Sequence, residues 1–242
     1  MNALEQITVG EFVAGDFRTA AVFSKYGIDF CCKGNRTLEE VCEKKGIDIH
    51  VVQDELNAVL ESKSDNNIDF KSWPIDLLID YIEKTHHRYV EEKSTALLFY
   101  LDKLCKVHGQ RHPELFEIGL HFKICATELA QHMKKEELIL FPFVKKMYYA
   151  LRDNTAIEQP HFGTVDNPIA MMQDEHENEG ERFRLIAKLT NDYNPPADAC
   201  ETYRVTFAML KEFEQDLHKH IHLENNIVFP KAQAMETKFD LI

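Results

Sequence analysis

Two stretches of identical spacing decide the fold: HMKKEELILFP at residues 132–142 and HIHLENNIVFP at residues 220–230. Both follow the pattern His-x-x-x-Glu-x-x-Ile-x-Phe-Pro without a gap. An α-helix places residues i and i+4 on the same side, about 6 Å apart along its axis. The histidine and the glutamate of each stretch can therefore reach one metal site, and we expect the Phe-Pro step to end or kink each helix nearby.

Each stretch is preceded by histidine at a similar distance. His86 and His87 lie about 46 residues before His132, and His176 lies 44 residues before His220. The chain therefore reads as a duplicated helical hairpin whose halves contribute matching ligands to one centre. The predicted ligands are His86, His132, Glu136, His176, His220 and Glu224.

Four imidazoles and two carboxylates suit two metal ions, each held by two histidines, with the glutamates bridging them. Nitrogen and oxygen ligands of this kind suit iron, manganese or zinc. A bridged pair inside a four-helix bundle favours iron. The predicted cofactor is two Fe ions in an oxo- and carboxylate-bridged di-iron centre.

The first ligand position has two candidates, because His86 and His87 are adjacent. On a regular helix only one of them can face the bundle centre. We choose His86 and expect His87 at the surface. His218 and His222 flank His220 by two residues, so we expect both to face away from the centre, with His222 the better candidate to support a ligand.

The rest of the chain is also helical in pattern. Glycine and proline are sparse, at 9 and 8 residues, and apolar residues recur at helical spacing. This predicts an all-α protein, with an up-down-up-down four-helix bundle and a small N-terminal helical domain. The predicted boundaries are residues 1–62 for the small domain, 63–73 for a polar linker and 74–242 for the bundle.

Capping boxes mark the start of two helices in the small domain. Thr8 with Glu11 and Thr37 with Glu40 both have the required spacing. From the first we expect one helix that runs through Phe23 and stops at Gly27.

Composition excludes several classes of function. Asp and Glu number 41 against 28 Lys and Arg, giving a net charge of −13, so we expect no nucleic-acid partner. No apolar run approaches the ~20 residues of a membrane span, and the first residues lack the features of a secretory signal. We therefore expect a cytoplasmic protein without membrane contact.

The six cysteines form no Cys-x-x-Cys pair, which argues against a zinc ribbon. Cys31 and Cys32 are adjacent, and a disulfide between neighbours is strained and labile. They are candidate redox thiols.

The stretch DFCCKGNRTL at residues 29–38 resembles the repair-of-iron-centres family of the ScdA/YtfE type. The residues around His132 and His220 resemble the second and fourth helices of that family. The resemblance implies a Cys-Cys-x-Gly domain joined to a haemerythrin-like di-iron bundle with the six ligands named above. It also implies repair of iron–sulfur clusters damaged by nitrosative or oxidative stress, by donating iron or removing nitric oxide.

Under this resemblance the partners are damaged iron–sulfur proteins and the diatomic ligands nitric oxide and oxygen, and the chain could pair as a homodimer. Cys31 and Cys32 would act as redox thiols or as transient ligands.

Two other functions fit the same centre. One is a haemerythrin-like protein that binds or senses oxygen or nitric oxide. The other is an enzyme, with nitric oxide reductase or peroxidase activity. Stable oxygen adducts would favour the first, nitric oxide turnover the second, and recovery of a damaged [4Fe–4S] protein would favour repair.

Overall fold

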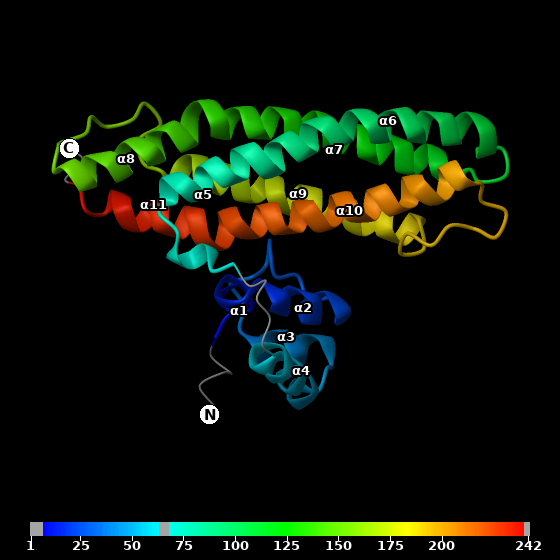
Figure 1. Cartoon of the computed structure of the whole chain (residues 1–242), viewed down its shortest axis with the longest axis horizontal. Coiled ribbons are helices and arrows are strands. Elements are labelled where there is room, and N and C mark those ends of the chain that lie inside the picture. Colours follow the sequence, from blue (N-terminus) through cyan, green and yellow to red (C-terminus); the bar gives the residue numbers. More distant parts are fainter. Residues whose placement is uncertain (1–6, 63–67, 240–242) are drawn as a thin grey trace.

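The computed structural model describes residues 7–62 and 68–239. Within them the regular elements are helices, and the one bridge of β type joins Thr8 to Thr37. An elongated bundle lies beside a smaller group of helices, α1 to α4 (Figure 1). The predicted all-α bundle with a small helical N-terminal domain is confirmed.

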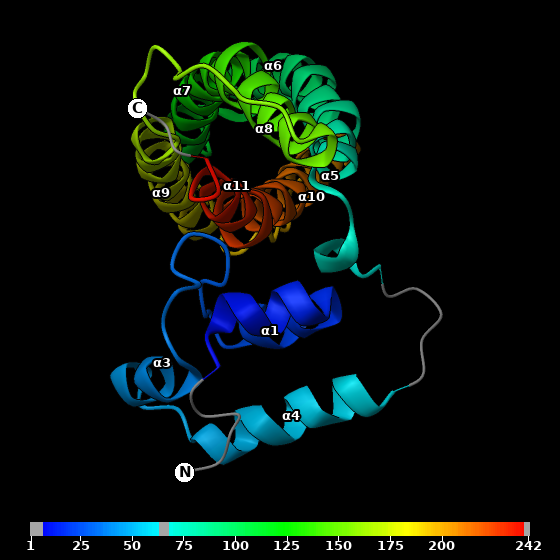
Figure 2. The ribbon, with the colours of Figure 1, turned by 90° about the vertical axis from the view of Figure 1, so that its left-hand side faces the viewer.

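Four helical columns build the bundle. The first holds α5 (Ile75–Tyr81), η4 (Ile82–His87) and α6 (Arg88–His108); the second holds α7 (Glu114–Lys135), η5 (Glu136–Leu140) and α8 (Phe141–Asp153); the third is α9 (Asp166–Leu189); the fourth holds α10 (Glu201–Leu223), η6 (Glu224–Val228) and α11 (Phe229–Glu236). Helix α6 packs against α7 and α10, and α9 packs against the same two helices. Seen end-on, the columns form a closed ring (Figure 2).

The sequence led us to expect that each Phe-Pro step ends or kinks its helix. The second and fourth columns do not end there. Instead η4, η5 and η6 are π-helical turns, and the helix continues beyond each of them. The Phe141 N–H donates to the carbonyl of Glu136, five residues back, and Phe229 repeats this bond with Glu224. Pro142 and Pro230 follow in the first turn of α8 and α11, where their missing N–H is tolerated.

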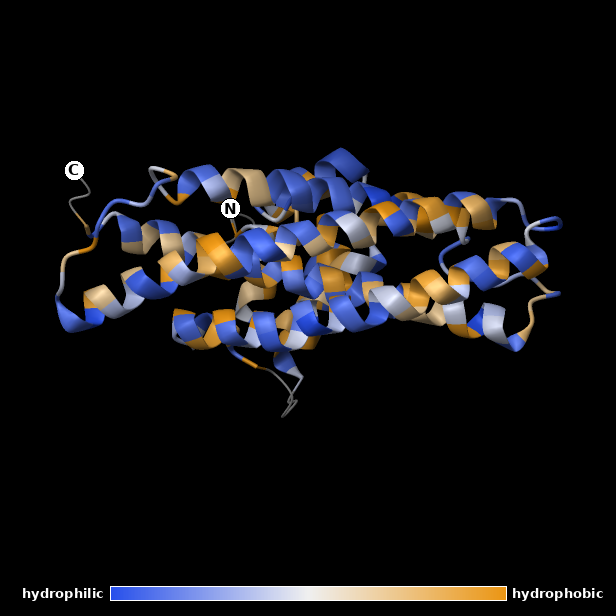
Figure 3. Ribbon diagram, turned by 90° about the horizontal axis from the view of Figure 1, so that it is seen from above, coloured by the Kyte–Doolittle hydropathy of each residue, from blue (hydrophilic) through white to orange (hydrophobic). Residues whose placement is uncertain are grey.

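Buried apolar side chains form two clusters in the bundle, and the first also takes in residues of the N-terminal helices such as Phe12 and Leu56. In the bundle the first includes Leu97, Phe122 and Phe213, and the second includes Leu78 and Phe141. Near the junction of the two clusters each column carries buried histidine or glutamate side chains: His86 and His87 in the first, His132 and Glu136 in the second, His176 and Glu179 in the third, and His220, His222 and Glu224 in the fourth. Each long helix carries both hydrophobic and hydrophilic residues (Figure 3), and no helix in the described ranges has an 18-residue stretch apolar enough to cross a membrane.

The N-terminal group holds four short α-helices: α1 (Val9–Gly15), α2 (Ala20–Lys25), α3 (Leu38–Lys45) and α4 (Ile49–Glu61). Both predicted capping boxes form. The single helix expected from Thr8 to Phe23 is wrong: Asp16 is extended and ends α1, and its carboxylate caps the short turn η2 (Phe17–Thr19) that leads into α2. Residues 63–67 of the predicted linker lie outside the described residues.

This group docks on the bundle at the π-helical turn of the fourth column. The side-chain amide of Asn226 donates to the carbonyl of Phe30 at 3.2 Å. Two glycines allow the close approach, because a Cβ on Gly10 or Gly34 would lie 2.3 or 2.8 Å from the Asn226 oxygen. The loop with the two adjacent cysteines is thereby held next to the layer of buried histidines.

Candidate metal centre

The two His-x-x-x-Glu stretches meet in the bundle centre. His132 and Glu136 lie where α7 passes into η5, and His220 and Glu224 lie where α10 passes into η6. All four side chains are buried. Since an unpaired carboxylate is costly to bury, this layer needs positive charge to balance it.

One group of ligand atoms joins the second, third and fourth columns. His132, Glu136, His176 and Glu224 each offer an atom, and these atoms all lie within 4.8 Å of one another. The Nε2 atoms of His132 and His176 are 3.0 Å apart, and Nε2 of His176 is 3.2 Å from Oε2 of Glu224. Two ligand atoms about 2.1 Å from one ion and at a right angle are about 3.0 Å apart, so these spacings suit one cation.

A second group joins the first, second and fourth columns. It consists of His87, Glu136, His220 and Glu224. Nε2 of His220 is 2.9 Å from Oε1 of Glu224, and Nε2 of His87 is 3.4 Å from Oε2 of Glu136. Glu136 and Glu224 therefore belong to both groups, which is the arrangement needed for carboxylates that bridge two cations.

The carboxylates themselves fit a bound metal. Neither oxygen of Glu136 accepts a hydrogen bond from any described residue, and Oε2 of Glu224 and Nε2 of His87 also lack a hydrogen-bond partner there. Buried polar atoms are normally hydrogen-bonded, and those left over in a native structure call for an unseen water or ion. Nitrogen and oxygen donors aimed at a common point suit a divalent transition metal.

The charges of the layer act strongly on one another. Burial lowers the pKa of His87, but Glu136 and Glu224 outweigh burial and raise it to about 10. Burial also lowers the pKa of His132, but the neighbouring carboxylates, chiefly Glu136 and Glu175, outweigh burial and raise it to about 10. Burial raises the pKa of Glu224, yet the surrounding histidines bring it well below its usual value. The centre is thus built to hold both carboxylates ionised beside positive charge.

The structure brings His87, rather than the chosen His86, into a group of ligand atoms, and we carry His87 forward as the proposed ligand. His86 and His87 are both buried, so the expectation that His87 lies at the surface is wrong. Nδ1 of His86 is 2.9 Å from Asp216, and its ring stacks on His220 with centroids 5.7 Å apart, outside both groups of ligand atoms. The reason is η4, because the extra residue of a π-helical turn rotates the residues after it by about 100° around the helix axis.

Several residues that orient the histidines were not predicted as site residues. Oε2 of Glu175 is 2.8 Å from Nδ1 of His132, and Oε1 of Glu137 is 3.1 Å from Nδ1 of His87. Such partners fix the ring so that Nε2 faces the bundle centre, where it could bind a metal. Both glutamates adjoin a predicted ligand in the sequence, which is the one signal that pointed to them. Asn225 plays the same part for His176, at 3.0 Å from its Nδ1.

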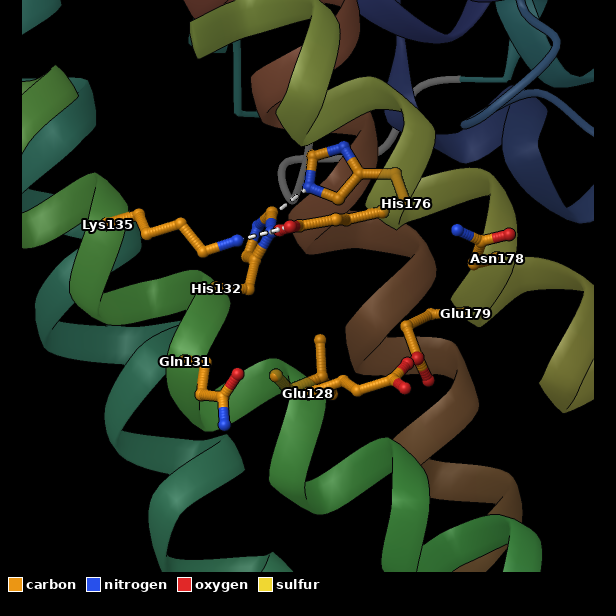
Figure 4. A pocket seen from close by; sticks show the side chains of 9 residues that line it. Glu128, Gln131, His132, Lys135, His176, Asn178 and Glu179 are labelled. Carbon is orange, nitrogen blue, oxygen red and sulfur yellow. Dashed lines mark hydrogen bonds and ion pairs between the residues drawn. The ribbon is translucent and has the colours of Figure 1, made fainter.

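A pocket of about 290 Å³ opens between α7 and α9 and reaches the centre from outside. His132, His176 and Lys135 form part of its wall (Figure 4). Glu175 also lines the pocket and forms an ion pair with Lys135. Small ligands or ions can approach the centre from this side.

Cys31 and Cys32 lie beside the centre, not in it. Sγ of Cys32 is 3.4 Å from the backbone oxygen of His176, and the Asn225 amide donates to the carbonyl of Cys31 at 3.1 Å. Both cysteines are free thiols, with their sulfurs 3.7 Å apart. Hydrogen bonding to Cys32 and burial raise the pKa of Cys31 well above its usual value.

His218 and His222 point away from the ligand groups, as expected. They face the docked N-terminal group, where both rings contact Phe30. Nδ1 of His222 is 3.0 Å from the side-chain amide of Asn226. His222 therefore supports the docked loop; its expected contact with a ligand residue is not among its hydrogen bonds in the described residues.

Comparison with known proteins places two family models on the chain. The model described as "Hemerythrin HHE cation binding domain" matches residues 78–232, and the model described as "Domain of Unknown function (DUF542)" matches residues 5–60. The first covers the buried His/Glu layer, and the second covers the adjacent cysteines.

Curated relatives are similar over nearly their whole length. The iron-sulfur cluster repair protein YtfE of Musicola paradisiaca is 32% identical over 93% of this chain and 95% of its own. The iron-sulfur cluster repair protein ScdA of Staphylococcus haemolyticus is 32% identical over 92% of this chain and 96% of its own. A probable iron-sulfur cluster repair protein of Haemophilus influenzae is 34% identical over 87% of this chain and 89% of its own.

Proposed function

Since the chain belongs to the family of iron-sulfur cluster repair proteins and carries a haemerythrin-type cation-binding domain, we propose that it repairs damaged iron–sulfur clusters through a di-iron centre. The proposed ligands are His87, His132, Glu136, His176, His220 and Glu224. The damage it reverses is nitrosative or oxidative, and its partners are the proteins that carry the damaged clusters.

The observation that carries this proposal is the sharing of Glu136 and Glu224 by two groups of four ligand atoms. Each group would supply two histidines to one ion, and Glu136 and Glu224 would be shared by both ions. When bound, an iron pair of this kind supplies exchangeable iron and coordination positions for nitric oxide or oxygen.

The residues around the pair hold it and control access. Glu175 and Glu137 keep His132 and His87 turned inward, and the two apolar clusters on either side exclude water from the layer. The pocket beside His132 and His176 gives one open approach, with the Lys135–Glu175 pair at its wall. Iron would be released, or nitric oxide admitted, on this side.

We place this activity in the cytoplasm. All six cysteines are free thiols, which suits a reducing compartment. We also propose the division of the chain into a small domain, a linker and a bundle at residues 1–62, 63–73 and 74–242. We further propose that the protein forms a homodimer, which a measurement of its mass in solution tests.

The test uses a [4Fe–4S] hydratase inactivated by nitric oxide. Purified iron-loaded protein should restore its activity under anaerobic conditions, and the metal-free protein should not. Iron content should fall in the repair protein as it rises in the hydratase. A protein that carries two irons, forms a stable oxygen adduct and restores no activity would instead be an oxygen carrier or sensor. Turnover of nitric oxide without recovery of the hydratase would make it an enzyme of nitric oxide removal.

A further inference from the structure

A second cluster of metal-ligating side chains lies outside the His/Glu centre. Atoms of Asp29, Cys31 and Cys32 all lie within 4.8 Å of one another, on the loop that docks against α9. Cys31 and Asp29 are largely buried, and Cys32 is partly exposed, so the cluster has one side open to solvent.

The distances within this cluster match those around one ion. Two thiolates bound tetrahedrally at about 2.3 Å lie about 3.8 Å apart, and the two sulfurs here are 3.7 Å apart. A carboxylate oxygen at about 2.0 Å and a thiolate at about 2.3 Å on the same ion lie about 3.5 Å apart. Oδ1 of Asp29 is 3.4 Å from Sγ of Cys31.

The surrounding structure holds this geometry in place. Oδ1 of Asp29 accepts the backbone N–H of Cys32 at 2.9 Å, and Nη1 of Arg184 is 3.2 Å from Oδ2 of Asp29. The contact with α9 depends on Gly180, because a Cβ there would lie 3.2 Å from the sulfur of Cys32. A glycine inside a helix such as the 24-residue α9 lowers the stability of the helix by about 1 kcal/mol relative to alanine. The space that Gly180 leaves for the Cys32 thiol therefore reduces the stability of α9.

We propose that Asp29, Cys31 and Cys32 form a second metal site, which binds one thiophilic divalent cation through two thiolates and a carboxylate oxygen. Binding releases two protons, one from each thiol, and Arg184 offsets part of the negative charge that remains. The open side at Cys32 leaves room for a further ligand from solvent or from a partner protein.

The position of this site suggests its use, which rests on the proposed function. The sulfur of Cys32 is 3.4 Å from the backbone of His176, a ligand of the His/Glu centre. Cys32 is partly exposed, so its thiolate could hand over Fe²⁺ between the His/Glu centre and a client protein, as a route separate from the pocket between α7 and α9. Thiolates are also the ligands that iron has in the clusters to be repaired.

Cobalt(II) titration of the full-length protein tests the site. The His/Glu centre is first loaded with ferric iron, the thiols are reduced, and oxygen is excluded. Thiolate-to-cobalt charge transfer in the near ultraviolet, read as the difference from the iron-loaded protein before cobalt is added, reports sulfur ligands and is silent for histidine and carboxylate. One equivalent should saturate the band, with release of two protons.

Matched variants locate the signal. Cys32→Ser should abolish the band, whereas Cys200→Ser, at an exposed cysteine far along the chain, should leave it unchanged. Asp29→Asn keeps an oxygen that can accept the loop N–H groups but loses the charge, and should weaken cobalt binding about tenfold. Circular dichroism checks that each variant is folded.

Two results would overturn the proposal: no thiolate band with one equivalent of cobalt, or a band that keeps its intensity in Cys32→Ser or in Cys31→Ser. Failure of the proposed function would look different, because iron content of the His/Glu centre and recovery of the damaged hydratase are measured separately. A cobalt band in a protein that restores no hydratase would keep the metal site and remove its role in repair.

Discussion

The Nε2 atoms of His132 and His176 face each other at 3.0 Å, although 44 residues separate them and they lie on different helices. Nδ1 of His132 is occupied by Glu175, and Nδ1 of His176 by Asn225. Each ring therefore has only its inner nitrogen left for the centre. The geometry of the site is set by contacts between helices, and each of these can be tested.

The first prediction concerns the shared carboxylates. In Glu136→Gln/Glu224→Gln the side chains keep their size but lose the charge that two cations require, so we expect far fewer than two irons per chain. Glu128→Gln, at the outer part of the pocket, is the control and should keep both. Metal analysis gives the count, and two irons per chain in the double variant would refute the assignment of the ligands.

The second prediction separates the two adjacent histidines. His87→Gln should reduce the iron content from two to about one per chain, because His87 is one of the two histidines of its group. His86→Gln should keep two irons, since the partner of His86 is Asp216. The opposite pattern would restore His86 as the ligand and show that the register of η4 is different.

These two histidines mark where sequence reasoning reached its limit. Helical spacing and internal duplication predict that His132, Glu136, His176, His220 and Glu224 lie together, and the structure brings all five side chains to one layer. At the first position the geometry favours His87 over the chosen His86, because η4 is a π-helical turn whose extra residue shifts the register of a regular helix.

Contacts between segments that are distant in the sequence could not be predicted from spacing either. Glu175 looks like a solvated neighbour of His176 along α9, yet its partner is His132 on α7. The docking of Cys32 beside His176 depends on Gly180 and Asn226, whose roles appear only once the N-terminal group and the bundle are seen together.

The third prediction concerns Glu175. Hydrogen bonding to His132 lowers the pKa of Glu175 to about 2, so this carboxylate is charged at all working pH values. Glu175→Gln removes a charged acceptor for the His132 N–H, and loss of such a partner weakens metal binding roughly 10–100-fold. Asp174→Asn, at the exposed neighbouring carboxylate, should have no effect. Competition with a chelator measures both affinities.

The fourth prediction concerns pH. Burial raises the pKa of Glu214 to about 7 from an ordinary value of 4.5. The folded protein thus binds more protons than the unfolded chain between these values, and stability falls as pH rises through that range. Glu214→Gln should remove this loss, raising the unfolding free energy at pH 8 by roughly 1–3 kcal/mol and having little effect at pH 4. Equal effects at both pH values, measured by urea unfolding, would contradict the role of burial.

The last prediction tests whether docking of the N-terminal group matters for the site. A Cβ at Gly10 would lie 2.3 Å from the Asn226 oxygen, so in Gly10→Ala either α1 or the Asn226 side chain must shift, and the protein should be destabilised by roughly 1–3 kcal/mol. At Gly15, the other end of α1, an added Cβ would have no neighbouring atom within 4 Å among the described residues, and Gly15→Ala should be neutral or slightly stabilising. Since Asn226 also holds the carbonyl of Phe30, displacement in Gly10→Ala should make Cys32 react faster with a thiol reagent, while iron content stays at two per chain. Unchanged thiol reactivity and stability in Gly10→Ala would show that the loop keeps its place without this contact.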